Sequence, residues 1–199
     1  MSAVLGSEAA EGVGFDIAEN ILGQARAIAA EADAPCRFVC CDARRVPVQY
    51  KGRFDLALIL VGALCWFRHA ADLLSQAAFL LREGGALVLM ENHPFSDQFA
   101  VPDEDCFDPA DPARLRYSYF KNTPFVDDFG MGYIDGGGRK SLPFMSFTHT
   151  LGETVTAACD AGLRIEQLRE FDRDVCDNFP MLSGKGVPLS FLLTAQKKK

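Results

Sequence analysis

Apolar positions along the first half of the chain fall into short runs separated by one helical stripe. Residues 12–15 form a short apolar strand that ends at Asp16, and residues 36–41 form a second strand that ends at Asp42. Between them lies a predicted helix whose buried face combines apolar residues at helical spacing: Ile21, Leu22, Ala25, Ile28, Ala29 and Ala32. Residues 54–61 are almost continuously apolar, which is typical of a strand covered on both faces in a parallel sheet.

The pattern then repeats and predicts the fold class. A helix is expected over residues 70–81, stopped by Gly84 and Gly85, and a buried strand over 86–90. Strands alternating with helices in this way predict an α/β fold, a Rossmann-like doubly wound and mostly parallel sheet. Residues 163–168 and 189–195 add two strands, expected as an antiparallel pair at one sheet edge.

One segment interrupts this regular alternation. Residues 95–147 are rich in Phe, Tyr, Asp, Pro and Gly, and a connection of this length in a compact domain is usually functional. We expect it to be a lid or substrate-binding insertion within a single domain that spans residues 1–199. Regular structure resumes at Thr150, which with Glu153 forms a capping box at the start of a helix.

Composition narrows the range of partners and compartments. The 199 residues carry a net charge of −7, which argues against nucleic acid or an anionic membrane as a partner. The apolar segments are too short to span a bilayer, and no secretory signal pattern precedes them. Seven cysteines, an odd number without a C-x-x-C pair, favour a reduced, cytoplasmic protein. With only three histidines, no metal site is expected.

Polar residues at the ends of the predicted strands are the first candidates for ligand binding, because ligands of open parallel sheets bind there. Asp16 could accept two hydrogen bonds from vicinal ribose hydroxyls, with Ile17 packed against an adenine face. Its alternative role is to cap the helix that follows. Asp42 could accept a hydrogen bond from an adenine amino group, and its alternative is an ordinary turn.

Five blocks of the sequence, in order, resemble class I S-adenosylmethionine-dependent methyltransferases of the small-molecule type: GVGFDIAENIL, FVCCDA, FDLALILVGALCWF, LLREGGALVLMENHPF and SFTHTLGETVTAACDAGLRIEQLREF. The resemblance covers roughly residues 10–197. It implies S-adenosylmethionine as the cofactor, with its ribose bound by Asp16 and its adenine flanked by Ile17 and Ala43. Asp42 would meet the adenine amino group, and the Val61, Gly62 and Ala63 turn would lie near the methionine moiety.

The sequence departs from this family at its beginning. The family starts with a strand and a loop of the type Asp/Glu-x-Gly-x-Gly-x-Gly, which residues 1–11 do not contain. The domain is therefore expected to be N-terminally incomplete, with the first strand of the family fold missing. Three arrangements would compensate for it: direct pairing of the two strands that would flank it, an upstream segment, or a second copy in a homo-oligomer.

Methyl transfer requires a positioned acceptor and, where the acceptor is protonated, a base. His93, at the exit of a central strand, is the candidate general base, and a turn histidine bonded to local backbone is its alternative. Glu91 could orient His93 or approach the sulfonium. For the acceptor, the candidates are Glu91, His149, Tyr119 and Phe120.

The sequence thus predicts S-adenosylmethionine-dependent methyl transfer to an unidentified small molecule. Two other hypotheses remain open. The missing glycine-rich loop favours an inactive remnant or an association subunit that does not bind the cofactor. A nicotinamide-dependent oxidoreductase would use Asp16 equally well, but it also needs a glycine-rich loop.

Overall fold

A computed structural model describes residues 11–102, 104–129 and 140–198. The chain divides into two compact units, Met1–Lys51 and Gly52–Lys199, which we call the N-terminal unit and the C-terminal unit. Each is described by itself. The single domain expected from the sequence stays a prediction.

The N-terminal unit is a β-α-β element. Strand β1 (Gly12–Asp16) runs parallel to β2 (Cys36–Cys40), in a continuous register from Gly12 opposite Cys36 to Asp16 opposite Cys40. Helix α2 (Glu19–Glu31) joins them and contacts both strands. Asp16 ends β1, as predicted, so its side chain lies at the carboxyl end of a parallel pair.

The predicted buried face of α2 is only partly correct. Leu22 and Ala29 are buried, whereas Ile21 and Ile28 are exposed by 41% and 58%. The β1–β2 pair is only two strands wide, and it covers a narrow stripe of the helix. Residues one position from that stripe therefore remain at the surface although they are apolar.

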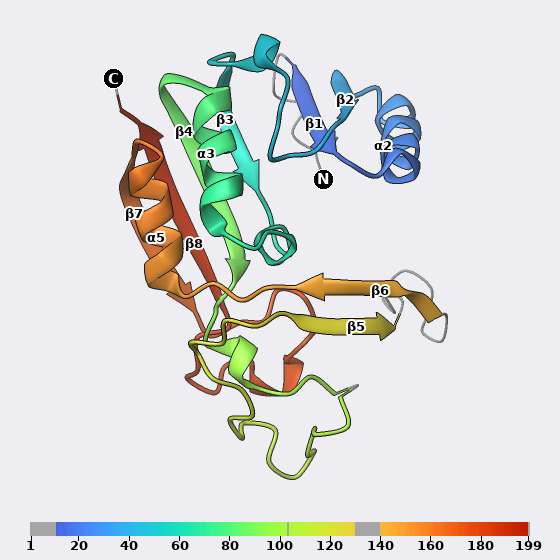
Figure 1. Cartoon of the computed structure of the whole chain (residues 1–199), viewed down its shortest axis with the longest axis vertical. Coiled ribbons are helices and arrows are strands. Elements are labelled where there is room, and N and C mark those ends of the chain that lie inside the picture. Colours follow the sequence, from blue (N-terminus) through green and yellow to red (C-terminus); the bar gives the residue numbers. More distant parts are fainter. Residues whose placement is uncertain (1–10, 103, 130–139, 199) are drawn as a thin grey trace. The chain divides into compact units, whose positions relative to one another are not determined.

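The C-terminal unit is built on a four-stranded sheet in the order β3-β4-β8-β7 (Figure 1). Its strands are β3 (Phe54–Ile59), β4 (Leu81–Asn92), β7 (Leu163–Phe171) and β8 (Ser190–Lys197). β4 runs parallel to β3, and β8 is antiparallel to both of its neighbours. The α/β fold class and the antiparallel pair are confirmed. Within that pair, β7 is the edge strand of the sheet. β8, which runs opposite to the other three strands, lies between β4 and β7.

Two helices cover one face of this sheet and contact each other (Figure 1): α3 (Ala70–Leu80) and α5 (Leu151–Asp160). The predicted capping box at the start of α5 is confirmed, because the Thr150 hydroxyl accepts from the Glu153 N–H and the Glu153 carboxylate accepts from the Thr150 N–H. Leu74 of α3 packs with Leu87 and Leu89 of β4 in the main core, where all three are fully buried.

The predicted role of the glycine pair is wrong. Helix α3 already ends at Leu80, and Gly84 and Gly85 lie inside β4, where the register with β3 shifts. Gly84 has a φ of +74°, and a Cβ on Gly85 would come within 3.0 Å of the backbone oxygens of Arg82 and Phe54. The pair therefore serves a local irregularity and a close approach of β3.

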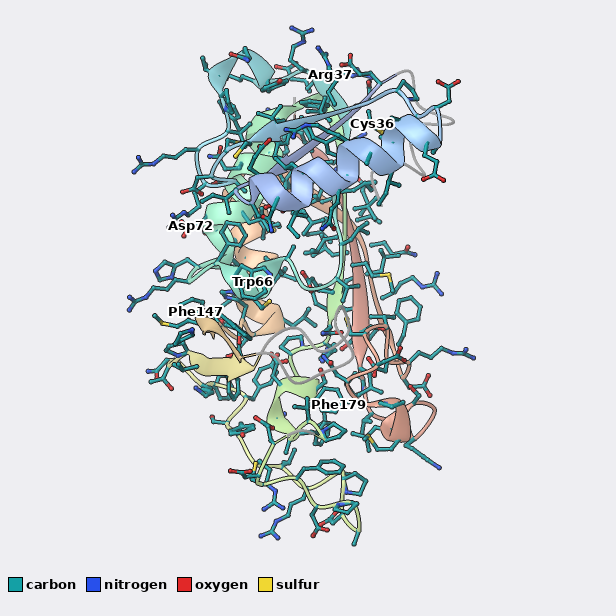
Figure 2. The ribbon with its side chains drawn as sticks, turned by 90° about the vertical axis from the view of Figure 1, so that its right-hand side faces the viewer. Cys36, Arg37, Trp66, Asp72, Phe147 and Phe179 are labelled. Carbon is teal, nitrogen blue, oxygen red and sulfur yellow. The ribbon has the colours of Figure 1, made fainter. Side chains whose placement is uncertain are left out.

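The predicted insertion contains an antiparallel hairpin, β5 (Phe125–Phe129) with β6 (Lys140–Ser146). Trp66 packs against Phe144 of this hairpin at a ring distance of 5.6 Å, and the Phe147 N–H donates to the Cys65 carbonyl at 2.9 Å. Figure 2 labels Trp66 and Phe147. A second small core surrounds Phe99 and Phe179. Two features of the predicted insertion, its run of three glycines at 136–138 and the aromatic Tyr133, lie outside the described residues.

In the part of the chain that the structure describes, no helix has the length and apolar character needed to cross a bilayer.

Candidate functional site

Glu91 organises the turn that follows β3. The burial of β4 alternates, with Leu87, Leu89 and Glu91 on the same buried side, so the Glu91 carboxylate continues the core-facing row. Its Oε2 accepts from the Gly62 N–H at 2.8 Å. Its Oε1 accepts from the N–H groups of Ala63 and Leu64 at 2.8 and 2.9 Å. The predicted methionine-side turn is thus held by one carboxylate.

This arrangement changes the role expected for Glu91. Both of its oxygens are engaged by backbone donors of the turn, and Glu91 does not orient His93, whose ring has other partners. Gly62 has a φ of +84°, so the turn passes through a left-handed conformation that favours glycine. Burial raises the pKa of Glu91, and the three backbone hydrogen bonds oppose that effect.

A second acid, Asp97, lies in the 3₁₀ turn Ser96–Gln98 and interacts electrostatically with Glu91. Burial, and after it the charge of Glu91, raises the pKa of Asp97 to about 7. The thiol of Cys65, which donates to the Gly62 carbonyl at 3.3 Å, belongs to the same cluster. Burial and the charges of Glu91 and Asp97 raise the pKa of that thiol to about 12. Glu91, Asp97 and Cys65 form what we call the acidic cluster.

The raised pKa of Asp97 predicts that stability falls as pH rises. The folded protein keeps the Asp97 proton up to about pH 7, whereas the unfolded chain releases it near the ordinary value of 3.8. The stabilisation is fully present below the pKa of Asp97 in the unfolded chain, and it is lost as pH rises through the pKa of Asp97 in the folded protein. Because a pKa difference of one between the two states is worth about 1.4 kcal/mol, wild type should lose about 2–4 kcal/mol more than Asp97→Asn between about pH 4 and pH 8. Urea titrations at several pH values measure the free energy of unfolding of both proteins. The same pH dependence of that free energy in wild type and Asp97→Asn would contradict the prediction.

His93 is held at both ring nitrogens. Its Nδ1 accepts from the Phe95 N–H at 3.0 Å, so the proton is on Nε2, which donates to Glu170 Oε1 at 2.8 Å. The ring is 5% exposed and stands edge-on to Phe191. Burial lowers the pKa of His93, and the hydrogen bond and charge of Glu170 oppose that effect. This geometry favours the structural alternative, and the role of general base stays a prediction.

Three of the residues predicted for the acceptor line one cavity of ≈ 840 Å³: His149, Tyr119 and Phe120. The Tyr119 hydroxyl accepts from the Leu151 N–H at 3.0 Å, and Phe120, exposed by 78%, packs edge-on against the Tyr119 ring. Glu91 is not among the lining residues. The structure therefore brings together three of the four predicted residues.

His149, which lines this cavity, and Glu91 both bond to the segment that follows β3. Nε2 of His149 donates to the carbonyls of Leu64 and Phe67, at 3.2 and 2.9 Å, while the Leu64 N–H donates to Glu91. His149 lines the cavity, and Glu91 does not. Both residues thus fix the shape of the same segment.

In the N-terminal unit, Asp16 ends β1 and Ile17 follows it directly. Asp16 Oδ1 accepts from the Ala18 N–H at 2.8 Å, at the start of α2. The predicted alternative, Asp16 as the helix cap, is wrong, because the N-cap is Ala18 and no side chain caps the helix. The bond to Ala18 uses one of the several lone pairs that a carboxylate offers. Ile17 is exposed by 70%, so its apolar surface is available to a ligand.

Asp42 is engaged by a neighbouring arginine. The Arg44 guanidinium donates to both carboxylate oxygens, with Nη2 to Oδ2 at 2.7 Å, and the Arg44 N–H donates to Oδ1 at 2.9 Å. These hydrogen bonds lower the pKa of Asp42 to about 2. Ala43 lies in the same turn. The geometry favours the turn alternative, because an adenine amino group would compete with Arg44.

Sequence reasoning missed Asp97. The only signal for it is an acid inside an apolar stretch, FSDQFAV over residues 95–101, that directly follows a central strand. Over residues 11–102, 104–129 and 140–198, no group of three or more His, Cys, Asp or Glu side chains is arranged to hold a metal ion.

Comparisons with known proteins agree with this architecture. Residues 1–85 match the family model described as a methyltransferase domain. No curated protein matches the chain in sequence. Solved structures share its fold at low identity.

An S-adenosylmethionine-dependent methyltransferase from Mesorhizobium loti has a TM-score of 0.65 at 23% identity, over 95% of this chain and 81% of that one. One from Methanosarcina mazei has a TM-score of 0.68 at 16% identity, over 100% and 87%. The magnesium protoporphyrin IX methyltransferase from Synechocystis PCC 6803, with bound S-adenosylhomocysteine, has a TM-score of 0.56 at 17% identity, over 99% and 68%. The match of residues 1–85 and the shared fold together show that the chain resembles methyltransferase domains and has the fold of S-adenosylmethionine-dependent methyltransferases.

Proposed function

We propose that this protein transfers a methyl group from S-adenosylmethionine to a small-molecule acceptor. The observation that carries the proposal is the Gly62–Leu64 turn, held open by three backbone hydrogen bonds to the buried Glu91 carboxylate. The turn follows β3 at the carboxyl end of a parallel pair, where ligands of this fold class bind. The overlapping segment Val61–Ala63 would lie beside the methionine moiety.

For the adenosine end of the cofactor, we propose Asp16 and Ile17. Asp16 keeps acceptor capacity beyond its bond to Ala18, and Ile17 offers an exposed apolar surface directly after it. Asp42 and Ala43 are weaker proposals, because Arg44 already occupies both oxygens of Asp42. His149, Tyr119 and Phe120 remain proposed acceptor contacts, supported by their common cavity.

The fold alone does not decide between this function and its alternative. A [4+2]-cyclase, SpnF, shares the fold with a TM-score of 0.59 at 15% identity, over 98% of this chain and 69% of that one. The alternative is a protein that keeps this fold without binding the cofactor. Within the described residues, β4 is the only strand that pairs with β3, so the other edge of β3 has no strand partner there.

Calorimetric titration of the 199-residue chain with S-adenosylhomocysteine tests the proposal. Wild type should bind, and Asp16→Asn should bind more weakly by about 1–3 kcal/mol, because it removes a charge-assisted hydrogen bond to the ribose. The Asn amide oxygen can still accept from Ala18, so the start of α2 is preserved. Glu31→Gln, which neutralises an exposed acid at the end of the same helix, is the matched control and should bind as wild type does.

Two results would count against the proposal. Absence of binding to wild type would favour the alternative that the chain does not use the cofactor. Equal affinities of wild type and Asp16→Asn would remove Asp16 from the site while leaving the methyltransferase proposal in place.

A further inference from the structure

The cavity that His149, Tyr119 and Phe120 line also carries positive charge. It lies in the C-terminal unit beside the starts of α3 and α5, which contact each other and begin at the same end of the sheet (Figure 1). Arg68, two residues before α3, and Lys121, directly after Phe120, are both among its lining residues. Two cationic side chains from distant parts of the sequence therefore border one cavity.

Arg68 has no counterion in the part of the chain that the structure describes. Its side chain is exposed, and its guanidinium makes no hydrogen bond or ion pair with any described residue. A guanidinium offers five N–H donors in a planar fork that matches the two oxygens of a carboxylate. All five are available to a ligand in the cavity.

Lys121 is held in place by neutral groups. Its Nζ donates to the hydroxyl and the carbonyl of Thr123 and to the Pro124 carbonyl, and it lies 4.3 Å from the centre of the Phe125 ring. The Lys121 carbonyl accepts from the Thr148 hydroxyl at 3.1 Å, which ties this residue to the segment before α5. Since its three donors are in use, Lys121 can attract a ligand through its charge alone.

Two acids also line the cavity, but neither is paired with these cations. The Glu153 carboxylate accepts from the N–H and the hydroxyl of Thr150, at 2.8 and 3.0 Å, so it is committed to the capping box. Asp160 is the last residue of α5, about 14 Å along the helix axis from Leu151. The positive side chains therefore lie where the two helices begin, and Asp160 lies at the other end of α5.

Aromatic surface adjoins the positive side chains. Phe120 is largely exposed and packs edge-on against Tyr119, with ring centroids 5.2 Å apart. The Tyr119 ring is fixed by the hydrogen bond between its hydroxyl and the Leu151 N–H. Ligand sites commonly combine an apolar wall with a few polar groups that fix orientation. This wall suits a planar apolar body that carries a negative group.

We propose that the methyl acceptor carries a carboxylate, which Arg68 binds and Lys121 attracts, while Tyr119 and Phe120 pack against its apolar part. This inference rests on the proposed function, since it names the acceptor class of the same reaction. Arg68 and Lys121 have a binding role in it, and neither gives or takes a proton or an electron. The aromatic pair favours an apolar carboxylic acid over a free phosphate ion, which the guanidinium alone would accept equally well.

Calorimetry with two probes of one shape tests the inference without knowledge of the acceptor. Cinnamate and cinnamamide share their planar body and their size, and only cinnamate is negatively charged near neutral pH. Wild type should bind cinnamate about tenfold more tightly than cinnamamide, because the amide brings no charge to the guanidinium. Inorganic phosphate at the same concentration should not displace cinnamate, since it has no apolar part.

Variants of the two cations assign the preference to this cavity. Arg68→Gln should weaken cinnamate about threefold to tenfold and leave cinnamamide unchanged. Arg68→Lys keeps the charge but not the fork, so it should weaken cinnamate less. Lys121→Gln should also weaken cinnamate less than Arg68→Gln does. Arg53→Gln changes an exposed arginine directly before β3, outside the cavity, and is the matched control that should bind both probes as wild type does.

Phe120→Ala tests the aromatic wall separately from the charge. It should weaken cinnamate and cinnamamide by the same factor, because both probes use the apolar surface that it removes. Every one of these variants should bind S-adenosylhomocysteine as wild type does, since the residues proposed for the cofactor are unchanged.

Each of the other outcomes overturns the inference. If wild type binds S-adenosylhomocysteine but does not prefer cinnamate, the cavity does not take a carboxylate and the proposed function still stands. The same conclusion follows if Arg68→Gln changes cinnamate binding no more than Arg53→Gln does, or if Phe120→Ala leaves both probes unaffected. If phosphate displaces cinnamate, the site binds anions without regard to an apolar part. If wild type does not bind S-adenosylhomocysteine, the proposed function fails and the role of the cavity as an acceptor site fails with it.

Discussion

Glu91→Ala should lower the free energy of unfolding by about 3–5 kcal/mol, because it leaves three N–H donors of one turn without their acceptor. The removed charge is itself costly to bury, which keeps the loss below the sum of three charge-assisted bonds. The same change should abolish binding of S-adenosylhomocysteine, since Gly62 and Ala63 lose the geometry that Glu91 imposes. Urea unfolding and calorimetric titration measure the two effects.

Two further variants separate the carboxylate from the size of the side chain. Glu91→Gln keeps one acceptor oxygen, which can still serve Ala63 and Leu64, so its loss should be smaller, about 1–2 kcal/mol. Glu83→Ala changes an exposed acid on the same strand and should leave stability nearly unchanged. A Glu91→Ala protein as stable as Glu83→Ala would show that the turn does not depend on this carboxylate.

His93→Ala should cost about 2–4 kcal/mol of stability, the second largest effect. It opens a space beside Phe191 and leaves the Phe95 N–H without the ring nitrogen that now accepts from it. Glu170→Gln should cost less than about 1 kcal/mol, because its side chain is 53% exposed and can bond to water. Urea unfolding of both variants gives the comparison.

The same variants decide between the two roles of His93. In a structural role, His93→Ala loses stability and its affinity for S-adenosylhomocysteine changes only as far as the fold loosens. A general base would give the opposite result, a stable variant that binds normally and loses turnover together with the acid limb of its pH profile. That result would return His93 to the catalytic position predicted from sequence.

Much of the fold could be predicted because its signals are local. The apolar runs that became β1, β3 and β4 are each visible within a few residues, and the capping box of Thr150 and Glu153 needs only four. The antiparallel pair β7 and β8 was also visible as a pair. Which of the two strands lies at the edge of the sheet could not be predicted, because a strand's position in a sheet depends on partners far away in the sequence.

The failures share this origin. Gly84 and Gly85 have the composition of a helix stop, but the approach of the Phe54 carbonyl, a tertiary contact, decides what the pair does. Ile21 and Ile28 fit a helical stripe, yet a two-stranded pair covers only part of it.

The candidate site was harder to predict than the fold. Glu91 and the Val61–Ala63 turn were singled out separately, and only the folded backbone joins them through three hydrogen bonds. The raised pKa of Asp97 cannot be read from sequence, since it depends on burial and on the charge of Glu91. Likewise, the identity of the ring nitrogen that bears the proton in His93 follows from Phe95 and Glu170 together.

The place of β8 inside the sheet has a consequence for biosynthesis. β4 pairs with β3 on one side, but its other partner, β8, is separated from it by residues 93–189. While the ribosome translates that stretch, the backbone N–H and C=O groups on one edge of β4 have no strand partner. Such an unpaired edge can pair wrongly with other nascent chains. We therefore expect the C-terminal unit to complete its sheet only after residues 190–197 have left the exit tunnel, and to depend on chaperones until then.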